Sequence, residues 1–166
     1  MSSKTIADNL GFIGNLSSKG FIAHITILTT SDNVMLGVLF SKIWTRPVPE
    51  EAMTNAKRNK LPVEDKESYK WIESFSFTDQ IAQEFSNKQI INIGDRDSDM
   101  FELFKVATKQ DASAKLVIRA NYDRKIMTEE NKGYNNLWDE LIKEEAKIKY
   151  PNICQGQKKE RQEIRY

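Results

Sequence analysis

A run of isoleucines near the middle of the chain ends in a glycine and a series of acids. Ile90–Ile93 is apolar and rich in β-branched residues, which predicts a buried strand. Gly94 then leads into three aspartates at alternate positions, Asp95, Asp97 and Asp99. From Met100 to Ala107 apolar residues recur at helical spacing, so we expect a helix with Asp97 or Asp99 as its N-cap. A carboxylate at the carboxyl end of a buried strand is where open α/β sheets place their chemistry, and Asp95 is therefore the first candidate site residue.

Apolar runs on either side of this stretch predict the remaining elements. Phe21–Thr29 and Val34–Trp44 are joined by a short polar turn, which indicates an antiparallel hairpin. Asp65–Phe85 has the spacing of a helix, and Ala114–Arg119 is another short apolar strand. The predicted order β-β-α-β-α-β is that of an α/β fold with an antiparallel start.

Both ends of the chain differ from this middle part. Residues 1–19 are rich in Ser, Asn, Gly and Lys, and we expect a flexible N-terminal arm there. Residues 20–124 form the predicted core. Residues 125–166 are more polar and predict a short helix at 134–143 followed by a basic hairpin at 147–166.

The composition limits the classes of function. With 25 Lys and Arg against 24 Asp and Glu, the chain has a net charge of +1, so any contact with nucleic acid has to come from a local patch. Its one cysteine, Cys154, excludes an internal disulfide. We find no apolar run long enough for a signal peptide or a membrane span, and we expect a cytoplasmic protein with no membrane partner.

The alternating acids suggest three kinds of metal site. An EF-hand loop needs a glycine at its sixth position and an acid at its twelfth, but Met100 and Val106 stand there, which rules it out. Ile93–Met100 resembles the late magnesium motif of haloacid-dehalogenase phosphatases, although neither early strand ends in the aspartate pair that those enzymes need. The third is a two-metal phosphoryl-transfer site, in which a carboxylate such as Asp95 bridges two Mg²⁺ ions about 3.5–4 Å apart.

The surrounding segments favour the third kind. Together, and in this order, five segments resemble the cut-and-paste DDE transposases of bacterial insertion sequences, in the family-four subclass that carries a β-rich insertion domain: Gly20–His24, Trp44–Pro47, Asp65–Trp71, Gly94–Asp99 and Leu116–Arg119. The resemblance extends from about Leu10 to the last residue.

This resemblance implies a fold, an activity and a site. The fold would be an RNase H-like mixed sheet with flanking helices, and residues 125–166 would begin the insertion domain. The family uses Mg²⁺ (or Mn²⁺) and an Asp-Asp-Glu triad to nick DNA ends and join them to a target. Asp95 matches the second aspartate, which is catalytic and binds metal, while Arg96, Arg119 and Arg124 are expected to contact DNA. Expected partners are transposon ends and an intact transposase or a second copy, in the bacterial cytoplasm.

The chain also departs from the family pattern. The first aspartate of the family lies on a strand before the hairpin, but residues 1–19 contain no apolar strand that ends in an acid. The glutamate lies in a helix beyond the insertion domain, which this chain does not reach. We therefore expect a fragment truncated at both ends and inactive alone, with a non-catalytic DNA-binding remnant and a phosphatase fragment as alternatives.

The missing first strand would lie at the centre of the sheet. Without it, two strands lose their ladder partner, and unpaired buried backbone groups are costly. We expect marginal stability, or direct pairing of the Asp95 strand with the hairpin. We also expect His24 to be a packed residue, and the three tryptophans to be core anchors: Trp44, Trp71 and Trp138.

Overall fold

The computed structural model describes residues 10–13, 18–46, 56–57, 60–127 and 133–143. The chain divides into two compact units between Asn121 and Tyr122, close to the predicted boundary after Arg124. The fold is mixed α/β, and the described strands form small two-stranded sheets. The predicted basic hairpin at 147–166, with Cys154, lies outside the described residues.

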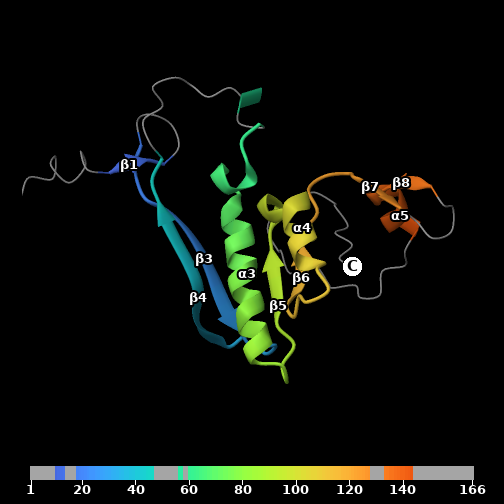
Figure 1. Cartoon of the computed structure of the whole chain (residues 1–166), viewed down its shortest axis with the longest axis horizontal. Coiled ribbons are helices and arrows are strands. Elements are labelled where there is room, and N and C mark those ends of the chain that lie inside the picture. The colour runs from blue at the N-terminus through green and yellow to red at the C-terminus, as the bar shows by residue number, and fades with distance from the viewer. Residues whose placement is uncertain (1–9, 14–17, 47–55, 58–59, 128–132, 144–166) are drawn as a thin grey trace, which may run out of the picture. The chain divides into compact units, whose positions relative to one another are not determined.

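The first unit contains the predicted antiparallel hairpin, formed by β3 (Ile22–Thr29) and β4 (Met35–Trp44) (Figure 1). Side chains alternate along β3, so that His24 is buried while Ile25 and Ile27 are about half exposed. This alternation leaves one face of the hairpin apolar and open to solvent.

The order of the remaining elements in this unit is also as predicted. The helix α3 (Tyr69–Glu84) is followed by β5 (Ile91–Gly94), the helix α4 (Phe101–Ala107) and β6 (Lys115–Ile118). The strands β5 and β6 pair in parallel, which the intervening helix makes possible.

Helix α3 holds the two sheets together. It contributes three of the five residues that form the buried apolar core, which are Ile72, Phe75, Ala82, Leu103 and Ala114. Its Ser74 hydroxyl is hydrogen-bonded to that of Thr26 on β3 at 2.5 Å, and its Thr78 hydroxyl accepts from the Asn92 side chain on β5 at 3.0 Å. Polar contacts from one helix therefore fix both strands.

A carboxylate on the same helix anchors the beginning of β6. Asp79 Oδ1 accepts hydrogen bonds from the backbone N–H groups of Ser113 and Ala114, each at 2.7 Å. These bonds satisfy donors that precede the first ladder residue, and they tie β6 to α3.

The two sheets do not join. In the described part of the chain β3 pairs only with β4, and β5 pairs only with β6. The expected direct pairing of the Asp95 strand with the hairpin is therefore wrong. The strands β3 and β5 run in opposite directions on the side of α3 that faces the sheets (Figure 1), with a pocket between them.

Part of the segment expected to be a flexible arm is folded. The strands β1 (Gly11–Phe12) and β2 (Lys19–Gly20) pair antiparallel, and Phe12 bridges to Arg46 after β4. The Arg46 guanidinium donates to both oxygens of Glu67, at 2.9 and 2.8 Å, and to the carbonyl of Ile13 at 2.9 Å. This arginine fastens the short hairpin to the chain that leads into α3. Residues 1–9 lie outside the described part.

The second unit begins with a strand pair and a helix. The strands β7 (Lys125–Met127) and β8 (Tyr134–Asn136) are antiparallel, and α5 (Leu137–Lys143) follows. The helix predicted from residue 134 begins three residues later because Tyr134–Asn136 pairs with β7 instead. Trp138, expected to be a core anchor, is 37% exposed. Across the described residues, the helices are too short or too polar to cross a membrane.

Candidate functional site at the end of β5

Asp95 occupies the position that the sequence predicts, directly after the last residue of β5. Its backbone is extended, and its side chain is exposed. Its Oδ1 accepts a hydrogen bond from the Asp97 N–H at 2.9 Å, which makes Asp95 the N-cap of a short 3₁₀ helix, η2 (Arg96–Ser98). The carboxylate is thus oriented by the turn that follows it.

This turn depends on a close contact between Gly94 and Ser98. Ser98 is completely buried, and its hydroxyl donates to the Asp95 carbonyl at 2.6 Å. A Cβ on residue 94 would lie 2.2 Å from Ser98 Oγ, which no side chain could tolerate without a shift. Gly94 is therefore needed for the approach of the turn to the strand end.

The other two aspartates do not have the predicted capping role. Helix α4 begins after Met100 without a side-chain cap. Asp99 is 5% exposed, and its Oδ2 accepts from the Asn121 N–H at 2.6 Å, so it binds the segment after β6. The capping prediction for Asp97 and Asp99 is wrong, because Asp97 lies within the 3₁₀ turn, Asp99 ends that turn, and Met100 occupies the N-cap position of α4.

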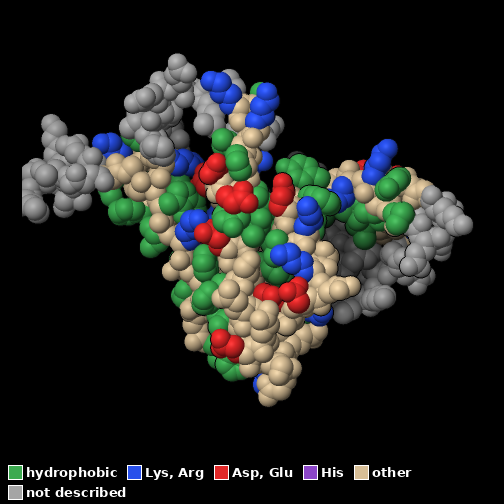
Figure 2. Space-filling view, viewed as in Figure 1, with side chains coloured by type: hydrophobic (Ala, Val, Ile, Leu, Met, Phe, Trp, Pro, Cys, Tyr) green, Lys and Arg blue, Asp and Glu red, His purple; other side chains and the backbone are tan. Residues whose placement is uncertain are grey.

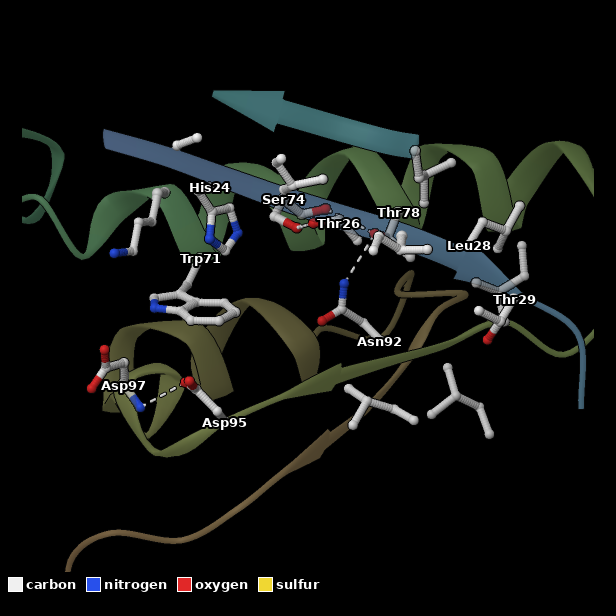
Figure 3. A pocket seen from close by; sticks show the side chains of 18 residues that line it. His24, Thr26, Leu28, Thr29, Trp71, Ser74, Thr78, Asn92, Asp95 and Asp97 are labelled. Carbon is white, nitrogen blue, oxygen red and sulfur yellow. Dashed lines mark hydrogen bonds between the residues drawn. The ribbon is translucent and has the colours of Figure 1, made fainter. Parts of the chain in front are cut away.

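The carboxylate of Asp95 borders a pocket of about 630 Å³ between β3 and β5 (Figure 3). The long walls are Ala23–Thr29 of β3 and Ile90–Ile93 around β5, and α3 supplies the floor with Lys70, Trp71, Ser74 and Thr78. Asn92 points from β5 toward α3 across the floor (Figure 3).

His24 and Trp71 form one end of the pocket, near Asp95 (Figure 3). His24 is only 9% exposed, as expected for a packed residue. The centroids of its ring and of the Trp71 ring lie 4.4 Å apart, and the two rings pack edge to face. Burial lowers the pKa of His24, and the nearby Lys70 lowers it further, against opposing effects of Asp95 and Glu73. The net effect on this pKa favours the neutral imidazole.

Two nitrogen atoms at this end lack partners. His24 Nε2 and Trp71 Nε1 are both buried and make no hydrogen bond within the described part of the chain. An indole N–H can only donate, so Trp71 needs an acceptor. A buried donor without a partner is rare and costly, so an acceptor placed at the Trp71 N–H would be favourable.

Two of the three arginines expected to contact DNA lie, like Asp95, just after the carboxyl ends of β5 and β6. Arg96 is exposed in η2, and Arg119 follows β6, where its N–H donates to the Gly94 carbonyl at 3.1 Å. Arg124 belongs to the other unit. Among the described residues on the face shown in Figure 2, basic and acidic side chains are interspersed and form no continuous basic patch.

The described acids do not by themselves fit a two-metal site. The acids that line the pocket are Asp95 and Asp97, and both come from the same turn. Within the described ranges, no three side chains of His, Cys, Asp or Glu gather in a group that could hold a metal ion. A second acid pair facing Asp95, which the phosphatase alternative requires, is likewise not found among these residues.

No protein-family model matches the chain, and no curated protein matches it either.

Other residues of this pocket have weaker signals in the sequence. Lys70 and Trp71 belong to one of the five segments, but no local pattern places them in a pocket. Asn92 could have been noticed as a polar residue inside an apolar, β-branched run, since a buried amide needs a partner. Ser74 and Thr78 gave no such signal, because small polar residues are common on helices.

Proposed function

We propose that the chain carries part of an RNase H-like core of the DDE transposase type, and that alone it neither cleaves nor joins DNA. The observation that carries this proposal is the position of Asp95: an exposed carboxylate at the carboxyl end of β5, bordering the pocket. The hairpin followed by two parallel strands, with helices between them, is compatible with such a core.

The expected inactivity follows from the number of carboxylates. A two-metal site needs several acids from different elements to hold two Mg²⁺ (or Mn²⁺) ions at the separation that phosphoryl transfer requires. Asp95 would be one ligand of such a site, and the other acid that lines the pocket, Asp97, comes from the same turn. We assign no step of DNA cleavage to this arrangement.

DNA contact is the part of the function that this unit could retain. Arg96 and Arg119 are exposed and lie just beyond the carboxyl ends of the paired strands β5 and β6, where their guanidinium groups could pair with phosphate oxygens. Because the net charge is only +1, this contact would be local and weak at physiological salt.

The DNA proposal can be tested by fluorescence anisotropy with a labelled DNA duplex over a range of salt concentrations. Arg96→Ala and Arg119→Ala should each weaken binding and reduce the salt slope by about 1, as expected for one lost phosphate contact. Lys88→Ala is the matched control, because Lys88 is an exposed cation at the opposite end of β5. An equal loss in all three variants would show non-specific attraction, and no change in the arginine variants would contradict the proposal.

The proposed inactivity has a separate test. Purified protein with Mg²⁺ or Mn²⁺ should leave supercoiled plasmid DNA intact. Nicking that disappears in Asp95→Asn would show that the chain holds a complete site and would overturn this half of the proposal.

A further inference from the structure

We propose that Asp99 is a positioning residue for DNA contact. Its buried carboxylate holds the segment after β6 in place, and this segment carries Arg119 to a phosphate group next to the turn of Asp95. The inference rests on the proposed function, because it gives a structural cause for the contact assigned to Arg119. Asp99 itself does not touch the DNA.

The segment that carries Arg119 lies beyond the end of the sheet. The parallel ladder between β5 and β6 ends with the pair Gly94 and Ile118. Residues 119–121 belong to no helix or strand, and the side chains of Arg119 and Asn121 are exposed. An arginine on a loose segment loses backbone freedom when it binds a phosphate, and this loss weakens binding unless the backbone is already held.

Two hydrogen bonds hold this segment against the turn after β5. The Arg119 N–H donates to the Gly94 carbonyl at 3.1 Å. The Asn121 N–H donates to Asp99 Oδ2 at 2.6 Å. The two acceptors flank Asp95 in the sequence, so the backbone of Arg119 is fixed on both sides to the turn that carries this carboxylate.

The burial of Asp99 distinguishes it from the other acids of the turn. Asp99 is 5% exposed, whereas Asp95 and Asp97 are exposed. A buried carboxylate is costly unless it is hydrogen-bonded, and a backbone N–H binds a carboxylate more strongly than a neutral acceptor. Asp99 is therefore suited to anchor a backbone group of another segment.

Charge and positioning predict opposite effects of removing Asp99. A further acid near the DNA repels phosphate, so by charge alone its removal would strengthen binding. Its removal also releases the Asn121 N–H and loosens the backbone of Arg119, which weakens binding. We expect the second effect to exceed the first. Among the described residues the side chain of Asp97 holds no other segment, so its removal has only the effect of charge.

The test measures binding of a labelled DNA duplex to the full chain by fluorescence anisotropy. At low salt Arg119→Ala should weaken binding roughly two- to fivefold, the range of one exposed ion pair. Asp99→Ala should weaken it by a similar factor and should likewise reduce the salt slope by about 1. In the Arg119→Ala background, Asp99→Ala should cause no further loss. Asp97→Ala should bind as tightly as the natural chain or more tightly.

Asp79→Ala is the matched control for a merely structural role. Asp79 is also an acid that accepts from backbone N–H groups, but these groups, of Ser113 and Ala114, precede β6. The substitution removes one negative charge and lowers stability without releasing Arg119. While the chain stays folded by circular dichroism, its affinity for DNA should not fall.

Two further variants address the hydrogen bond itself. Asp99→Asn removes the charge but retains an oxygen that can accept from the Asn121 N–H, so it should bind DNA at least as tightly as the natural chain. Asn121→Pro removes the donor at an exposed position and should weaken binding as Asp99→Ala does. This variant tests the same bond if Asp99→Ala does not fold.

The results separate this inference from the proposed DNA contact. If Arg119→Ala binds DNA like the natural chain, the contact is wrong and the role of Asp99 is wrong with it. If Arg119→Ala weakens binding while Asp99→Ala or Asn121→Pro does not, only the positioning role is wrong. An equal loss in Asp79→Ala, or a further loss from Asp99→Ala in the Arg119→Ala background, would also overturn it.

Discussion

Replacing Gly94 by alanine tests whether the turn after β5 is built as the structure describes. The added Cβ would lie 2.2 Å from Ser98 Oγ, 2.9 Å from Ser98 Cβ and 3.8 Å from a side-chain carbon of Ile118. Ser98 is fully buried and donates to the Asp95 carbonyl, so it has no free space into which to move. The turn must therefore shift, and the hydrogen bond that orients it is lost or strained.

The expected cost follows from three contributions. Overpacking of a filled site costs about 1–3 kcal/mol, and the loss of one hydrogen bond costs about 1 kcal/mol. Removing the glycine stabilises the folded state by about 0.5–1 kcal/mol, because the unfolded chain loses conformational freedom. We expect Gly94→Ala to lower the free energy of unfolding by about 2 kcal/mol, or to lower Tm by roughly 8–16 °C if the first unit, Met1–Asn121, unfolds cooperatively.

Urea unfolding monitored by circular dichroism measures this cost, and a double-mutant cycle identifies its cause. Ser98→Gly removes both atoms that the new Cβ would meet. The double variant should therefore be more stable than the sum of the single changes predicts, by at least about 1 kcal/mol. Strict additivity, or a neutral Gly94→Ala, would refute the close contact and with it the described orientation of Asp95.

Two further predictions concern α3 and the hairpin. Asp79→Ala should lower the free energy of unfolding by about 2 kcal/mol, because two backbone N–H groups lose a charged acceptor. Glu84 is an exposed acid on the same helix, and Glu84→Ala should change this free energy by less than about 0.5 kcal/mol. Equal effects of the two substitutions in urea unfolding would contradict the anchoring role of Asp79. The pKa of His24 is below its ordinary value of 6.5 in the folded state, so the unfolded chain binds the proton first as the pH falls. Stability should therefore be complete above pH 6.5 and decrease below it, and urea titrations across this range should show a smaller decrease for His24→Gln.

The elements of the first unit could be predicted from sequence because each has a strong local signal. The β-branched runs of the hairpin and of Ile90–Ile93, and the helical spacing after Met100, depend only on neighbouring residues. The identity of the capping acid could not be predicted in the same way. Asp95, Asp97 and Asp99 are equally suited to cap a helix, and the buried contact of Ser98 decides which one does.

The separation of the two sheets could not be predicted from local pattern. Apolar strands without a partner suggested that β5 would pair with the hairpin. Instead, one hydrogen bond between Ser74 and Thr26 and another between Asn92 and Thr78 hold each sheet against α3 on either side of the pocket. Such contacts join residues 14 and 48 positions apart, and no periodicity in the sequence reports them.

The structure also separates the segments of the transposase resemblance by role. Arg46 and Glu67 form a bidentate ion pair that links two of these segments. The Nζ atom of Lys70 lies 5.4 Å from the centroid of a Trp44 ring and 6.0 Å from that of a Trp71 ring. These contacts hold the fold together, and any protein with the same framework would need them whatever its chemistry.

Under the proposed function, chemistry specific to phosphoryl transfer would depend on fewer groups, namely the exposed Asp95 and the two arginines that follow β5 and β6. Most of the resemblance therefore concerns residues that stabilise the fold. Only the residues just after the carboxyl ends of β5 and β6 support an activity. DNA binding by Arg96 and Arg119, measured against Lys88, is for this reason a stronger test of function than further likeness among the segments that hold the framework together.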